Sequence, residues 1–297
     1  EDGIRDIGVT GVQTCALPIS EMYVQGVSTR KVTAIVQELC GLDITSTQVS
    51  RAAAELDEQL GAWRSRAIGE VTYLILDARY EKVRHDGAIV PCALLTAIGV
   101  GPDGKRSILG CSVQLSEAET HWRSFLQSLV DRGMRGVKLV VSDDHAGLKA
   151  ARQAVLAGVP WQRCQFHLMQ NAMAHVPKVG MRAEVAADLR RVFDADEPAE
   201  AERRLRDIAA RYQKTAPQLA AWLEENVPEA LTVLRLPAAH RRRLRTTNGL
   251  ERLNKEIKRR TRVATLFPNE ASLLRLASAV LSRSEEHTSE LQSRQYL

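Results

Sequence analysis

The sequence lacks long apolar runs. No stretch approaches the roughly 20 consecutive apolar residues that a transmembrane helix needs, although 44% of the 297 residues are hydrophobic. We therefore expect no membrane partner, and enough apolar side chains to fill a sizeable core. A chain of this length ordinarily forms one large domain or two modest ones.

Cysteines are few and show no pairing pattern. The five cysteines are scattered through the chain and odd in number: Cys15, Cys40, Cys92, Cys111 and Cys164. This distribution argues against a disulfide framework and favours reduced thiols. We therefore expect a cytoplasmic protein.

Positive charge is concentrated in one segment. Residues 241–262 hold ten basic residues and two glutamates, a local net charge of +8, whereas the whole chain carries +5 and the remainder therefore −3. Charge gathered in this way indicates a surface that binds the phosphates of a nucleic acid. We predict DNA contacts from Arg241, Arg242, Arg243, Arg245, Arg252, Lys255, Lys258, Arg259, Arg260 and Arg262.

The same segment predicts a helix that begins at Asn248. Leu250 and Ile257 fall on its apolar face, and Glu251 is the acidic residue at its head. Glu251 also completes a capping box with Asn248 and can pair with Lys255. A purely structural role for this glutamate is therefore an alternative to a catalytic one.

The two ends of the chain read differently from the rest. Residues 9–19 (VTGVQTCALPI) and 283–293 (RSEEHTSELQS) are both encoded by one DNA string that resembles a common library adapter, the second in reverse complement. We therefore assign residues 1–19 and 284–297 to adapter-like, non-native tails. We expect the remainder to be an internal fragment of a longer protein.

Residues 21–66 predict two short helices around a tight turn near residues 40–43. Ser28, and then Thr45 or Ser46, are N-cap candidates, each followed by apolar residues at helical spacing. A helix-turn-helix motif and a plain helical hairpin that packs or dimerises both fit this pattern. In the first case Thr47, Gln48, Ser50 and Arg51 would face DNA.

Three strands and a helix follow. Residues 71–83, 88–100 and 106–115 are rich in apolar and β-branched residues and are separated by turn signals, which predicts antiparallel strands. A helix over 117–132 and a fourth strand from 137 come next. This β-β-β-α-β order opens a ribonuclease-H-like core.

The 107 residues between Asp143 and Glu251 have helical patterning and no strand signal. We therefore predict an α/β protein whose ribonuclease-H-like core is interrupted by a helical insertion. The core is assigned to residues 70–150 and 244–282, and the insertion to residues 151–243. The small helical segment at 21–66 precedes the core.

Two predicted strands end in carboxylates, Asp77 and Asp143. A buried carboxylate without a partner is costly, and a divalent metal ion would supply one. Either aspartate alone could be an ordinary turn residue. The pair, together with Glu251, favours a metal site. Asp143 is preferred to the adjacent Asp144, because Ser142 and Asp143 continue the strand.

Four motifs resemble the mutator-type family of bacterial insertion-sequence transposases: LDARYEKVR at Asp77, VVSDDHAGL at Asp143, WQRCQFHLMQN at Cys164 and His167, and TTNGLERLNKEIKRRTRV at Glu251. The resemblance covers residues 21–282. It implies a catalytic triad of Asp77, Asp143 and Glu251 that holds two Mg²⁺ ions, with Mn²⁺ as a substitute.

The resemblance also implies the reaction and the partners. The expected activity is cleavage at the terminal inverted repeats of an insertion sequence, followed by strand transfer into target DNA. The expected partners are the terminal inverted repeats, the target DNA and further copies of the chain in a homo-oligomer. The expected location is the bacterial cytoplasm. A non-catalytic DNA-binding protein and a purely hydrolytic ribonuclease-H-like nuclease are the alternatives.

Three further residues are auxiliary candidates. Cys164 and His167 form a C-x-x-H pair, but His175 is the one nearby completion for a zinc site, so the ligand count argues against zinc. The resemblance instead implies a structural or substrate-positioning role beside the active site. His145 could orient a phosphate or be a solvated turn histidine.

Overall fold

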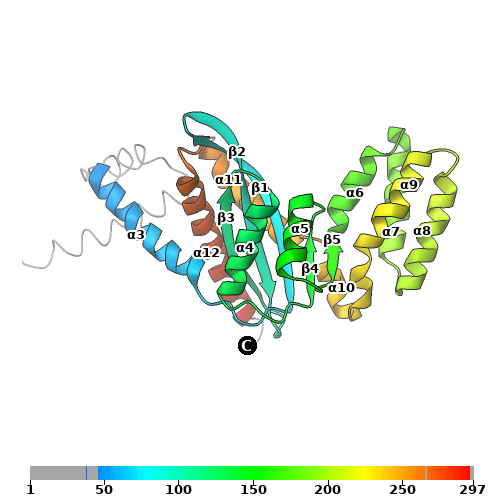
Figure 1. Ribbon diagram of the computed structural model, residues 1–297, viewed down its shortest axis with the longest axis horizontal. Helices are drawn as coiled ribbons and strands as arrows, with labels where there is room; N and C mark the ends of the chain where they lie inside the picture. Colours follow the sequence, from blue (N-terminus) through cyan, green and yellow to red (C-terminus); the bar gives the residue numbers. More distant parts are fainter. Residues whose placement is uncertain (1–37, 39–45, 265, 295–297) are drawn as a thin grey trace, which may run out of the picture.

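The computed structural model describes residue 38, residues 46–264 and residues 266–294 (Figure 1). One five-stranded sheet has the order β3-β2-β1-β4-β5. Its strands are β1 (Tyr73–His85), β2 (Ala88–Val100), β3 (Arg106–Gln114), β4 (Leu139–Ser142) and β5 (Trp161–Arg163).

Helices surround this sheet. They are α3 (Ser46–Ser65), α4 (Glu119–Asp131), α5 (Ala146–Val155), α6 (Gln165–Ala174), α7 (Arg182–Phe193), α8 (Pro198–Tyr212), α9 (Pro217–Asn226), α10 (Ala238–Leu244), α11 (Asn248–Ala264) and α12 (Glu270–Arg294). Short 3₁₀ turns lie at Val179–Met181, Val227–Ala230 and Thr232–Arg235. Within the described residues, no helix is long and apolar enough to cross a membrane.

The antiparallel half of the sheet is the predicted strand meander. β1 and β2 pair along their whole length, from Tyr73 opposite Val100 to His85 opposite Ala88. Their two-residue turn has positive φ at both Asp86 (47°) and Gly87 (81°), the conformation that matches the twist of a hairpin. The three predicted antiparallel strands are thus confirmed.

The parallel half completes a ribonuclease-H-like order. β4 runs parallel to β1, and β5 runs parallel to β4. β5 corrects one expectation, because it lies in the stretch that showed no strand signal. Three residues are too few for an alternating pattern to stand out in the sequence. The mixed sheet with helices confirms the predicted fold class.

Helices cover both faces of the sheet (Figure 1). On one face, Leu76 of β1 belongs to a buried cluster with Trp122 of α4 and Leu148 of α5. On the other face, the buried cluster that includes Ile75 also includes Leu273 of α12. Neighbouring residues of β1 thus face opposite layers, as the pleat requires. Helices α6 to α9 form a separate bundle beyond β5, where the helical insertion was expected.

The chain before the sheet is described from α3 onward. The first predicted helix and its turn, at residues 28–45, lie outside the described residues apart from Glu38, so the helix-turn-helix stays a prediction. α3 packs against α12, where Asp57 forms an ion pair with Arg275 and Arg64 donates a 3.0 Å hydrogen bond to Ser278.

α12 continues into the segment assigned to an adapter-like tail. Glu285 lies in this part of the helix. Its carboxylate accepts a 3.0 Å hydrogen bond from the Trp63 indole and forms a 2.7 Å ion pair with Arg66. It also accepts a 3.0 Å hydrogen bond from the backbone N–H of Ile108. These contacts join the helix end to both α3 and β3.

Candidate active site at the ends of the parallel strands

The register of the parallel strands brings Asp77 and Asp143 to the same level. Ile75 pairs with Val141, and each aspartate stands two residues further along its strand direction. Adjacent strands are about 4.8 Å apart, so the two carboxylates emerge from neighbouring strands. Asp77 is 8% exposed, whereas 42% of the Asp143 side chain is exposed.

The sequence suggested that Asp77 ends its strand, but the strand continues beyond it. β1 continues to His85 because β2 pairs with it to the end of the hairpin. The parallel ladder with β4, however, stops at Ile75. Asp77 therefore lies at the end of the parallel half of the sheet while remaining inside the antiparallel half.

Ion pairs distinguish the two adjacent aspartates. Asp144 lies 2.9 Å from the Arg163 guanidinium and 3.0 Å from the Lys149 ammonium. Asp143 accepts a 2.7 Å hydrogen bond from the backbone N–H of Asp144, and its nearest basic side chain among those that the structure describes is His167, at 4.0 Å. This arrangement supports Asp143 as the metal ligand, since Asp144 already has two cationic partners.

Helix α11 lies against β1 at Asp77. The side-chain amide of Asn254 donates a 2.7 Å hydrogen bond to Asp77 Oδ2. The guanidinium of Arg79 donates a hydrogen bond to the backbone carbonyl of the same Asn254. Near the end of the helix, the hydroxyl of Thr261 donates a 3.2 Å hydrogen bond to Glu81 of β1. These contacts fix the helix along the strand.

Glu251 belongs to the same helix. It lies in α11 three residues before Asn254, and residues three apart share a helix face. The side chain of Glu251 lies outside the described residues.

The donor set fits a hard divalent cation. Carboxylate oxygens from Asp77 and Asp143 are ligands that Mg²⁺ and Mn²⁺ prefer. Among the side chains that the structure describes, no group of three His, Cys, Asp or Glu residues is placed to hold a metal ion. A third ligand would have to come from Glu251.

Cys164 and His167 lie beside the aspartates. The backbone N–H of Cys164 donates a 2.7 Å hydrogen bond to the carbonyl of Ser142, which places this cysteine next to the end of β4. Its buried thiol is 3.4 Å from the backbone nitrogen of Thr247 and 3.6 Å from its hydroxyl. The pair thus links the end of β4 to the segment before α11.

The protonation of this pair is shifted. Burial raises the pKa of the Cys164 thiol, but hydrogen bonds with His167 and Thr247 outweigh burial, so the pKa lies below its ordinary value. The hydrogen bond with Cys164 is the largest cause that raises the pKa of His167 from 6.5 to about 9, with Asp143 and Asp77 adding to it. His167 is therefore a cation at neutral pH.

His145 lies on the other side of the strand end. Its Nδ1 is 3.9 Å from a Glu117 carboxylate oxygen and has no hydrogen-bond partner among the described residues. It immediately precedes α5. The structure thus brings the His145 ring close to Glu117, in the loop before α4.

The predicted DNA-binding residues lie on and around two helices, α10 and α11, and differ in whether they contact other parts of the chain. Arg242, Arg243, Lys255 and Lys258 are exposed. Four others are engaged within the chain: Arg241 with the carbonyls of Leu236 and Asp196, Arg245 with Asp194, and Arg259 and Arg260 with Glu256. The side chains of Arg252 and Arg262 lie outside the described residues.

Sequence reasoning missed three residues of this region. Asn254 could have been found, since it stands one turn after Glu251 on the same helix face. Arg163 and Glu229 could not, because the ion pairs that they form join segments far apart in the chain. No local pattern carries that information.

A mixed sheet of this order, with aspartates on two neighbouring strands where their parallel pairing stops, defines a ribonuclease-H-like protein. The profile of the Mutator family of transposases matches residues 13–290. The chain belongs to this family.

Similar proteins are transposases of bacterial insertion sequences. The transposase of IS406 from Burkholderia multivorans is 57% identical over 276 residues, which are 92% of this chain and 71% of that protein. The transposase of ISRM5 from Rhizobium meliloti is 44% identical, covering 91% of this chain and 68% of that protein. The transposase of IS256 in transposon Tn4001 from Staphylococcus aureus is 36% identical, with 88% and 67% covered.

Proposed function

We propose that this transposase cleaves DNA at insertion-sequence ends and transfers the freed strand into target DNA, using a metal site formed by Asp77, Asp143 and Glu251. The observation that carries the proposal is the 2.7 Å hydrogen bond from Asn254 to Asp77. It docks α11 against β1 at one of two aspartates on neighbouring strands, which supports Glu251, three residues before Asn254 on the same helix, as the third ligand.

The three carboxylates would hold Mg²⁺. Bound there, the ions would stabilise charge on the attacking and leaving oxygens of an in-line phosphodiester displacement. Asn254 holds the Asp77 carboxylate in a fixed orientation, as residues that hydrogen-bond metal ligands commonly do. The Arg163 and Lys149 ion pairs engage Asp144, which leaves Asp143 as the aspartate proposed to bind the metal.

The chain supplies positive charge as well. His167, a cation below its pKa of about 9, lies 4.0 Å from Asp143 and offsets part of the negative charge of the paired aspartates. Lys255 and Lys258 are exposed on α11, the helix that carries Glu251. They would bind backbone phosphates and so hold a DNA strand beside the carboxylates.

The first test is a calorimetric titration of Mn²⁺ into the chain and into a double variant, Asp77→Asn with Glu251→Gln. We expect Mn²⁺ binding by the chain and its loss in the double variant. Asp131→Asn, at an exposed aspartate of α4, is the matched control and should bind Mn²⁺ as the parent does.

The second test is cleavage of a duplex that carries an insertion-sequence end, with detection of the new 3′-hydroxyl. Cleavage that needs Mg²⁺ and both Asp77 and Glu251 would support the proposal. Cleavage without joining to a target would favour a purely hydrolytic nuclease.

Equal Mn²⁺ binding by the parent and the double variant would contradict a site built from these carboxylates.

A further inference from the structure

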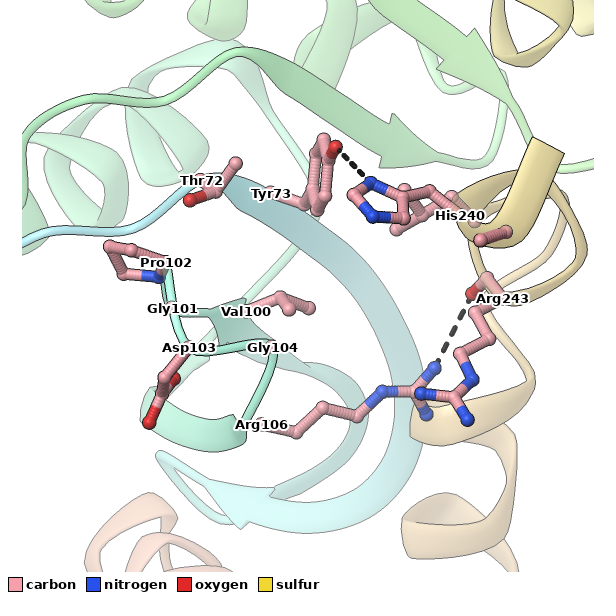
Figure 2. Close-up of a pocket in the computed structure, with 12 residues that line it drawn as sticks. Thr72, Tyr73, Val100, Gly101, Pro102, Asp103, Gly104, Arg106, His240 and Arg243 are labelled. Atoms are coloured by element: carbon pink, nitrogen blue, oxygen red, sulfur yellow. Dashed lines mark hydrogen bonds between the residues drawn. The ribbon is translucent and has the colours of Figure 1, made fainter. Parts of the chain in front are cut away.

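A cavity of about 290 Å³ lies between the start of β1, the turn that joins β2 to β3, and helix α10 (Figure 2). This volume is close to the lower limit of about 300 Å³ for small-molecule sites. Tyr73 is on β1 four residues before Asp77, so the cavity is about 13 Å along the strand from the paired aspartates. It is separate from the candidate active site.

One wall of the cavity is aromatic. The hydroxyl of Tyr73 is 2.8 Å from Nδ1 of His240, and the two rings meet edge to face, with centroids 5.8 Å apart and planes at 80°. Tyr73 is nearly buried, whereas His240 is exposed. The hydrogen bond fixes the imidazole beside the opening, and Val100 and Leu244 add apolar surface. A planar, partly apolar group fits such a wall.

The other side of the cavity carries two arginines. Arg106 donates a 3.4 Å hydrogen bond to the backbone carbonyl of Arg243, and Figure 2 shows the two guanidinium groups on the same side of the cavity. Guanidinium groups placed together bind phosphate or carboxylate groups well.

Asp103 is the one acidic residue that lines the cavity. Its carboxylate accepts a 3.0 Å hydrogen bond from the backbone N–H of Lys105 and lies 3.7 Å from the Lys105 ammonium. Asp103 is thus held within its own turn. The cavity keeps a net positive charge beside its aromatic wall.

We propose that this cavity binds one nucleoside phosphate, with the phosphate at Arg106 and Arg243 and the base against Tyr73 and His240. Aromatic and histidine rings are the surfaces on which proteins stack unpaired bases. The nucleotide is either a free molecule or an unpaired unit of a DNA strand. The second source rests on the proposed function, in which the same chain holds a cleaved DNA end.

The test is a calorimetric titration of the full chain with dAMP, inorganic phosphate, a single-stranded 10-mer and the matching duplex. Arg243→Gln should weaken dAMP binding at least tenfold. Arg242→Gln is the matched control, because Arg242 is exposed on the same helix and does not line the cavity; its effect should stay below twofold. His240→Ala should weaken dAMP binding and leave phosphate binding unchanged.

The same data separate the two sources. A single strand that binds more tightly than dAMP and loses affinity in Arg243→Gln indicates a DNA strand, whereas equal affinities indicate a free nucleotide. Equal losses in Arg243→Gln and Arg242→Gln would overturn the proposal, since they reveal unspecific charge attraction. Phosphate binding as tight as dAMP binding, or no binding of dAMP and single strand alike, would also overturn it.

Asp77→Asn distinguishes this inference from the proposed function. The variant should bind dAMP as the parent does, because Asp77 does not line the cavity. If neither dAMP nor the single strand binds at the cavity while Asp77-dependent Mn²⁺ binding persists, the inference fails and the proposed function stands. If dAMP binds but Mn²⁺ binding does not depend on Asp77, the reverse holds.

Discussion

Arg163 forms a 2.9 Å ion pair with Asp144, although only 2% of the arginine side chain is exposed. The same Nη1 is 3.2 Å from Glu229 and donates a 2.9 Å hydrogen bond to Asn226. Lys149 pairs with both carboxylates, at 3.0 Å from Asp144 and 2.9 Å from Glu229. The network therefore joins the end of α9 and the following turn to the residue next to Asp143.

Removing Arg163 should destabilise the fold. In Arg163→Met, Asp144 and Glu229 share one lysine and face an apolar side chain. Loss of one partner of a fully buried ion pair typically costs about 3–5 kcal/mol; because both carboxylates are partly exposed and keep Lys149, we expect the lower end of this range. Urea unfolding should show a loss in this range. Arg203→Met is the control, because Arg203 pairs with Glu200 on the surface and such pairs contribute at most about 1 kcal/mol. Similar losses in both variants would contradict a special role for the network.

Removing the Asn254 amide should weaken the metal site. Asn254→Ala deletes the hydrogen bond to Asp77, and loss of a partner of this kind typically costs 10- to 100-fold in metal affinity or activity. We expect at least a tenfold weaker Mn²⁺ affinity by calorimetry and a comparable loss of DNA cleavage. Lys255→Gln, on the exposed side of α11, should change the salt dependence of DNA binding and leave Mn²⁺ affinity unchanged.

The contrast between Asn254 and Arg163 shows what the sequence could and could not predict. Asp77 and Asp143 could be proposed as ligands because buried strands leave runs of apolar residues, and Glu251 could be assigned to a helix because helical spacing is local. Asn254 shares that local spacing. The partners of Arg163 are Asp144, which follows β4, and Glu229, so they depend on tertiary packing that no periodicity records.

Cys164 should act as a structural acceptor. Its buried thiol accepts from the backbone N–H of Thr247, and leaving that donor unsatisfied costs about 1–3 kcal/mol. Cys164→Ala should therefore lower the free energy of unfolding by about this amount in urea. Cys164→Ser keeps an acceptor and should lose less. An alanine variant as stable as the parent would show that the Thr247 contact contributes little.

Gly147 should tolerate no side chain. A Cβ at this position would lie 2.2 Å from the Glu117 carbonyl oxygen and 2.9 Å from the Glu119 nitrogen, both backbone atoms. Gly147→Ala must therefore move α5, which begins just after Asp143 and Asp144. We expect a loss of about 1–3 kcal/mol and reduced Mn²⁺ affinity. Gly180→Ala is the control, because nothing lies within 4 Å of its Cβ position.

Glu256 should make stability depend on pH. Its hydrogen bonds with Arg259 and then Arg260 lower its pKa from 4.5 to about 2, against the effect of burial. A depressed folded-state pKa means that the stabilisation is fully present above pH 4.5 and is lost as the pH falls towards 2. Because a third of the side chain is exposed, solvent screens the pairs and limits this contribution to about 1 kcal/mol.

Glu256→Gln removes the charge while keeping the shape of the side chain. Urea unfolding of parent and variant should differ by up to about 1 kcal/mol at pH 7, and the difference should vanish between pH 4.5 and about 2. Glu202→Gln, at an exposed glutamate of α8, controls for the change in net charge. A difference that persists unchanged at pH 2 would mean that Glu256 stabilises α11 through packing or neutral hydrogen bonds, because a protonated carboxyl no longer attracts the two arginines.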